Sequence, residues 1–147
     1  MTTDHEDKTA ISDVLTRYST AIDRRDWSLY RTCFTHDIQA VFPTGAWKNL
    51  EDLASFMEEW HANLGLTVHH VNNIVIAVDG ETATSRCYGN ANVQTSREHP
   101  EQVLNLHGFY DDTLVRTPDG WKISQRTAKV VSAVLEKSSE LSLISRS

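Results

Sequence analysis

The sequence of 147 residues is poor in the residues that define several special classes of protein. It has two cysteines, three prolines and six glycines, and no apolar run of the roughly 18 residues that a membrane span needs. Cys33 and Cys87 belong to no CxxC or Cys/His cluster, which predicts free thiols in a reducing compartment. The polar start of the chain lacks the apolar segment of a secretory signal. We therefore expect a cytoplasmic protein without a membrane span.

Positive charge is also scarce. Lysine and arginine total 14 against 20 acidic residues, which gives a formal net charge of −6. This balance argues against nucleic acid and against an anionic membrane surface as partners. The histidines form no HxxxH or HxH pair, and no GxSxG, Walker or GxGxxG motif is present. We therefore expect no metal and no cofactor.

The pattern of apolar residues predicts one domain over residues 1–147, with a core over about 8–132, a frayed start and a loose serine-rich tail. Apolar residues recur at helical spacing from Ala10 to Ile22. Asp26 is placed to cap a short second helix, and Asn49 to cap a third over roughly 50–63. Strand patterns follow over 38–42, 66–78, 82–95, 102–116 and 121–135, several of them separated by turn signals.

Helices followed by long strands indicate an α+β fold. We expect a strongly curved, mixed and mostly antiparallel sheet that wraps around the N-terminal helices as a cone-shaped barrel. A flat sandwich is the less favoured alternative, because the helical stripe needs a sheet face to cover it.

Polar residues on one strand are candidates for chemistry. Side chains alternate across a strand, so Thr67, His69, Val71 and Asn73 share one face, and His70 lies on the other. If the interior takes the first set, an imidazole and an amide face the core. A lone strand histidine is, however, more often solvated or hydrogen-bonded than catalytic.

Two further residues stand near the predicted interior. Asp23 ends the first helix, and His107 lies on a later strand with Phe109 on its face. A carboxylate that accepts the N–H of one imidazole nitrogen makes the other nitrogen a better base, which suits proton transfer near neutral pH. An aspartate at a helix end can equally be a cap or a surface charge.

Several local strings, taken in order, resemble the SnoaL-like branch of the nuclear transport factor 2-like superfamily over about residues 8–132. The strings are Ala21-Ile22-Asp23 with Asp26-Trp27, Phe34-Thr35, Thr67-Val68-His69-His70-Val71, Gly108 with Tyr110 and Asp112, and Asp119-Gly120-Trp121-Lys122-Ile123. The resemblance implies a cystatin-like cone with a deep pocket. Members include scytalone dehydratase, bile acid 7α-dehydratase, hexachlorocyclohexane dehydrochlorinase, polyketide cyclases and ketosteroid isomerases, and also non-catalytic small subunits of ring-hydroxylating dioxygenases.

The resemblance also implies roles for single residues. Asp23 and His69 match the aspartate and histidine with which the dehydratase and dehydrochlorinase members work, and His107 falls near a second pocket histidine. Arg126 matches an arginine on the last strand. Ile22 stands where scytalone dehydratase has a tyrosine, and the oxyanion pair of ketosteroid isomerases is not recognisable. Residues expected to contact the substrate are Tyr18, Asn73, Phe109 and Arg126.

Two functions compete at this point. One is a cofactor-independent lyase or isomerase that acts on a small hydrophobic or polycyclic molecule through Asp23 and His69. The other is a non-catalytic ligand-binding or assembly module. We also expect a homodimer or homotrimer, because the outer sheet face needs cover, with Val93, Val103, Leu114 and Val115 as candidates for that contact.

Overall fold

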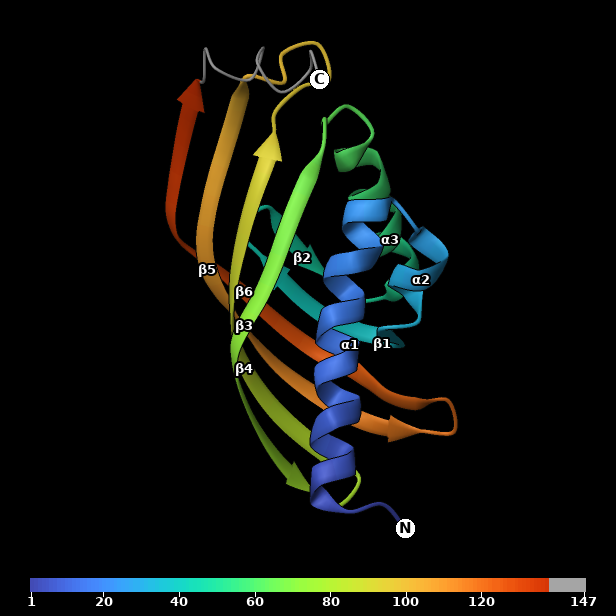
Figure 1. Ribbon diagram of the computed structural model, residues 1–147. Coiled ribbons are helices and arrows are strands. Elements are labelled where there is room, and N and C mark those ends of the chain that lie inside the picture. Colours follow the sequence, from blue (N-terminus) through green and yellow to red (C-terminus); the bar gives the residue numbers. More distant parts are fainter. Residues whose placement is uncertain (138–147) are drawn as a thin grey trace.

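The computed structural model describes residues 1–137, in which two helices precede the first strand and a third lies between the second and third strands of the sheet (Figure 1). Helix α1 spans Asp4–Arg24, α2 spans Trp27–Arg31 and α3 spans Leu50–His61. Asp26 and Asn49 cap α2 and α3 as expected, because their side chains accept hydrogen bonds from the backbone N–H groups of Leu29 and Asp52. Of the loose tail expected over 136–147, residues 136 and 137 belong to the last strand, and residues 138–147 lie outside the described part of the chain.

Helix α1 begins six residues earlier than the apolar pattern predicts, so the expected frayed start is wrong. Thr3 and Glu6 form a capping box, in which each side chain accepts a hydrogen bond from the other's backbone N–H. One turn later, the Asp7 carboxylate accepts hydrogen bonds from Arg116 and from the Trp121 indole. Polar contacts with distant strands therefore fix the first turns of α1, and these contacts leave no periodic apolar signal.

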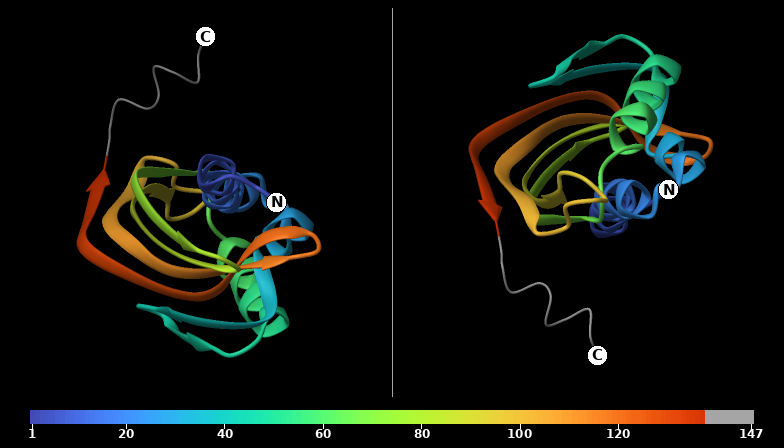
Figure 2. Two further views of the ribbon diagram at one scale, coloured as in Figure 1. Left: turned by 90° about the horizontal axis from the view of Figure 1, so that it is seen from below. Right: turned by 90° about the horizontal axis from the view of Figure 1, so that it is seen from above.

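Six strands form one mixed sheet in the order β2-β1-β6-β5-β4-β3. The strands are β1 (Phe34–Phe42), β2 (Gly45–Trp47), β3 (Thr67–Asp79), β4 (Thr82–Gln94), β5 (Gln102–Thr117) and β6 (Gly120–Lys137). Strands β1 and β6 are parallel, and the other neighbours are antiparallel. The sheet is curved but not closed, so the expected α+β fold is confirmed as an open sheet and not as a closed barrel (Figure 2).

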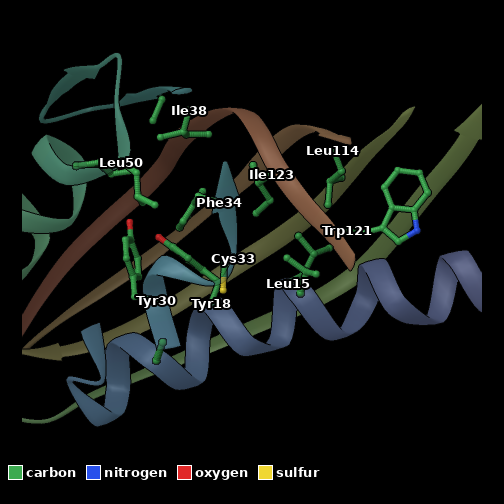
Figure 3. Packing of buried hydrophobic residues seen from close by; sticks show 14 of the residues in the cluster. Leu15, Tyr18, Tyr30, Cys33, Phe34, Ile38, Leu50, Leu114, Trp121 and Ile123 are labelled. Atoms are coloured by element: carbon green, nitrogen blue, oxygen red, sulfur yellow. The ribbon is translucent and has the colours of Figure 1, made fainter. Parts of the chain in front are cut away.

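The core lies between the helices and the concave face of the sheet. Leu15 and Tyr18 of α1 point toward the sheet, and Leu114 and Ile123 of β5 and β6 point back toward the helix (Figure 3). Burial of this apolar stripe is the main force that holds α1 on the sheet.

Two of the residues expected in an oligomer contact belong to this interior. Val93 is 8% exposed and Leu114 is 0% exposed. Strand alternation turns both toward the helices, so neither can cover the outer face of the sheet. In the part of the chain that the structure describes, no helix combines the length and apolar character that crossing a membrane requires.

Candidate functional site

The C-terminal end of α1 presents Asp23 to the first residues of β3. Arg25 takes a left-handed conformation (φ 56°) that stops the helix. The Arg25 guanidinium then donates hydrogen bonds to the carbonyl oxygens of Ile22 and Gly65 and to the hydroxyl of Thr67. One side chain thus joins the helix end to the loop before β3, and this clamp fixes Asp23 against that strand.

Asp23 binds His69 at two points. The His69 ring nitrogen Nδ1 lies 2.7 Å from Asp23 Oδ1, and the His69 backbone N–H donates to Asp23 Oδ2 at 2.8 Å. The Thr67 hydroxyl donates to Asp23 Oδ1 at 2.9 Å. Strand β3 is an edge strand, so the His69 N–H points away from the sheet and the carboxylate satisfies it.

This geometry sets the protonation of the pair. Burial raises the pKa of Asp23, but the hydrogen bonds from the His69 ring and backbone outweigh burial, and the pKa is lowered overall. The carboxylate is therefore ionised at neutral pH. Because it only accepts hydrogen bonds, Nδ1 of His69 must carry a proton, and in the neutral form of the imidazole the lone pair is then on Nε2. The His69 side chain is 14% exposed and the Asp23 side chain is 25% exposed, so the pair is mostly buried but still reaches solvent.

His69 borders a cavity of about 430 Å³ between the helices and the concave face of the sheet. The volume lies in the range of small-molecule sites. Aromatic and aliphatic side chains make most of the wall, among them Phe42, Phe56, Trp60, Val93, Leu104 and Leu106. An apolar wall with few polar groups suits a ligand with a hydrophobic body.

Tyr18 and Tyr110 form part of the wall and separate the cavity from a buried ion pair. The Arg126 guanidinium stacks on both rings, 4.2 Å and 4.3 Å from their centres, and donates two hydrogen bonds of 2.7 Å to Asp112. Burial raises the pKa of both tyrosines, so their hydroxyls stay protonated. Tyr18 is placed as the sequence predicts. Arg126 is not, because Asp112 and the two rings enclose its side chain, which is 1% exposed.

His107 and Phe109 also border the cavity, but strand register directs their side chains the other way. His69, Ala91 and Leu106 pair across three strands on the concave face. The next set of residues that pair across these three strands contains His107, and strand alternation turns this set outward. The exposed His107 ring contacts Asn90 at 2.6 Å instead of Asp23 or His69. Phe109 faces outward as well, with the Arg86 guanidinium 4.4 Å from its ring centre.

Asn73 does not share the face of His69 as expected. A bulge interrupts the pairing of β3 with β4 between Asn72 and Val75, and Asn73 takes a φ of 50° there. The extra residue ends the simple alternation on which the prediction depends. Asn73 is exposed, and we leave it, His107, Phe109 and Arg126 out of the proposed site.

The sequence interpretation missed His61, the last residue of α3. Its ring borders the cavity, is 6% exposed and places Nδ1 2.7 Å from the Met57 carbonyl oxygen. Burial lowers the pKa of His61 to about 4, so the ring is neutral near pH 7. In the sequence, the only indication that His61 lies beside the cavity was its position directly after the apolar residues of α3. Within residues 1–137, no three His, Cys, Asp or Glu side chains are grouped to hold a metal ion.

Comparison with known proteins identifies the family. The model of the SnoaL-like domain matches residues 3–127. The chain belongs to the SnoaL-like family. It is 33% identical over 126 residues to an uncharacterized protein of Mycobacterium tuberculosis, and the match covers 82% of each chain.

Solved structures of the nuclear transport factor 2-like superfamily share the fold. A protein from Kribbella flavida has a TM-score of 0.83 at 21% identity over 90% of this chain and 95% of that one. A candidate scytalone dehydratase from Novosphingobium aromaticivorans has a TM-score of 0.79 at 23% identity, over 86% and 85%. A hexachlorocyclohexane dehydrochlorinase has a TM-score of 0.75 at 18% identity, over 87% of each chain. At these identities the similarity establishes the fold and not the reaction.

Proposed function

We propose that this SnoaL-like protein is a cofactor-independent lyase or isomerase that acts on a small hydrophobic or polycyclic molecule. The observation that carries the proposal is the contact of 2.7 Å between His69 Nδ1 and Asp23 Oδ1 beside an apolar cavity. A base in a cavity of this kind can remove a proton from a carbon atom next to an activating group.

In the proposed reaction, His69 Nε2 takes the proton while Asp23 stabilises the imidazolium that forms. The electron pair of the broken C–H bond becomes a C=C bond, and the bond to a hydroxyl or other leaving group breaks. For a hydroxyl, the imidazolium returns the proton to the departing oxygen, and water leaves. The C–H electron pair ends in the C=C bond and the leaving group departs with the pair of its own bond, so the step needs no redox partner.

Two observations favour this reaction over a purely structural module. The space beside His69 is an open cavity and is not filled by side chains. The neighbours include a candidate scytalone dehydratase and a hexachlorocyclohexane dehydrochlorinase, whose names both denote elimination reactions. A buried polar pair costs folding free energy unless it is well compensated, so a chemical role gives it a reason to be present.

A probe reaction tests the base without knowledge of the natural substrate. The base-induced ring opening of 5-nitrobenzisoxazole breaks one C–H bond and releases a coloured phenolate. We expect the protein to accelerate this reaction and His69→Ala to lower kcat/KM by at least about a hundredfold, since a positioned general base contributes about 10²–10⁴-fold.

His70→Ala is the matched control, because His70 is adjacent in sequence and exposed on the opposite face of β3. It should leave the rate unchanged. Equal rates for the wild type and His69→Ala would contradict the catalytic proposal and favour a ligand-binding module.

A further inference from the structure

The cavity contains a second imidazole that the proposed reaction does not use. The His61 ring nitrogen Nδ1 lies 2.7 Å from the carbonyl oxygen of Met57, one turn earlier in α3. A carbonyl oxygen only accepts hydrogen bonds, so Nδ1 must carry a proton. The ring is neutral near pH 7, and its Nε2 atom therefore holds a lone pair and no hydrogen.

The lone pair on Nε2 has no protein donor among residues 1–137. The side-chain polar atoms that are sealed from solvent and unpartnered belong to other residues, which are Ser19, Tyr30, Thr35, Ser85 and Arg126. His61 Nε2 is not among these sealed atoms, and His61 borders the cavity. A molecule that enters the cavity can therefore supply a donor to Nε2.

We infer that His61 is a specificity-determining residue, whose Nε2 atom accepts a hydrogen bond from a hydroxyl or N–H group of an aromatic ligand. The nearby walls fit such a body, because Phe56 and Trp60 precede His61 on α3 and also border the cavity. This inference takes the cavity of the proposed function as the ligand site, and it adds a requirement for a donor at a second position.

The requirement follows from the cost of an unpaired acceptor. A ligand without a donor would cover Nε2 and remove it from water without forming a new hydrogen bond, and this desolvation cost weakens binding. A site built around a hydrogen bond therefore rejects analogues that lack the donor more strongly than a purely apolar site does. His61 and His69 both present acceptors, so a ligand that offers only acceptors suits neither imidazole.

A pair of probe molecules tests the inference by binding alone. 2-Naphthol and 2-methoxynaphthalene differ only in the replacement of the O–H hydrogen by a methyl group. Calorimetry on the full chain should show that the wild type binds 2-naphthol about tenfold more tightly, the scale of one hydrogen bond with a penalty for the unpaired acceptor. His61→Phe keeps an aromatic ring and should bind the two probes equally.

The His69→Ala variant separates the two imidazoles, and it should keep the preference for 2-naphthol. A preference that persists in His61→Phe, or that disappears in His69→Ala, overturns the inference, as does a wild type that binds neither probe or shows no preference. In the wild type, the ¹⁵N resonance of His61 Nε2 should indicate a hydrogen-bonded acceptor with 2-naphthol and an unpaired acceptor with the ether. This measurement does not depend on the folding of a variant. If the 5-nitrobenzisoxazole assay fails while this selectivity holds, the proposed reaction is wrong and the binding role of His61 stands.

Discussion

At the scale of single residues, the Asp23 carboxylate fits its surroundings only when both of its oxygen atoms accept hydrogen bonds. Oδ1 accepts from Thr67 and from the His69 ring, and Oδ2 accepts from the His69 backbone. In Asp23→Asn one of these positions becomes an amide donor that faces another donor. We expect the free energy of unfolding to fall by about 1–3 kcal/mol, measured by urea denaturation at pH 7.

The same change should lower turnover of 5-nitrobenzisoxazole by at least about tenfold, because a neutral amide cannot stabilise the imidazolium as a carboxylate does. An exposed neighbour, Asp26→Asn, alters the cap of α2 and should leave that rate unchanged. Undiminished turnover in Asp23→Asn would show that the charge of Asp23 has no part in the reaction.

His61 gives a prediction about pH. Burial lowers the pKa of His61 from an ordinary 6.5 to about 4, so the unfolded chain binds a proton at a higher pH than the folded protein does. The associated stability is present above pH 6.5 and is lost as the pH falls toward 4, on the order of 3 kcal/mol in all. Urea denaturation of His61→Phe should show a smaller loss between pH 7 and pH 4.5 than the wild type. The same loss in both proteins would contradict this account.

Two simple rules drew attention to Asp23 and His69, because Asp23 follows an apolar helical stripe and strand alternation separates His69 from His70. These rules left the roles of both residues open, and the resemblance to the SnoaL-like family singled out the pair. His107 obeyed the alternation rule too, but the rule does not say which of two faces is concave. His61 was missed because its role depends on the meeting of a helix end with a distant sheet, a tertiary contact that no local pattern reports.

At the scale of secondary structure, the capping box at the start of α1 replaces the apolar signal that the first turns lack. Thr3→Ala removes the side-chain acceptor for the Glu6 N–H and should lower the free energy of unfolding by about 1 kcal/mol. Thr16→Ala, at an exposed position in the middle of the same helix, should raise it or leave it unchanged, since alanine is the better helix former. Equal effects in thermal denaturation would mean that the cap does not stabilise α1.

The strands were predictable to within a few residues, apart from β2 and the early start of β1. Each long strand has a clear period and several end at a turn such as Asp79-Gly80, where Gly80 has a φ of 60°. The bulge near Asn73 was not predictable, because it arises where the strand bends with the sheet. Curvature is a property of the whole sheet, so the positions of its irregularities are fixed by packing and not by local sequence.

At the scale of the whole molecule, the outer face of the sheet carries exposed apolar residues. Val134 on β6 and Tyr88 on β4 are 49% and 46% exposed. We expect this face to be covered in a homodimer or homotrimer. Light scattering should report the oligomer for the wild type and a smaller species for Val134→Asp. Leu66→Asp, in the loop before β3, is the control and should remain assembled. A wild type that is monomeric at micromolar concentration would contradict the expectation.

The amide of His69 has a further use, as a spectroscopic reporter. This N–H donates to Asp23 and not to a neighbouring strand, so its ¹H and ¹⁵N resonances should respond directly to the charge on the carboxylate. Its rate of hydrogen exchange should measure how often the end of α1 separates from β3, independently of how often the sheet opens. A single backbone resonance can thus record how often the proposed base is correctly assembled, in solution and before any substrate is known.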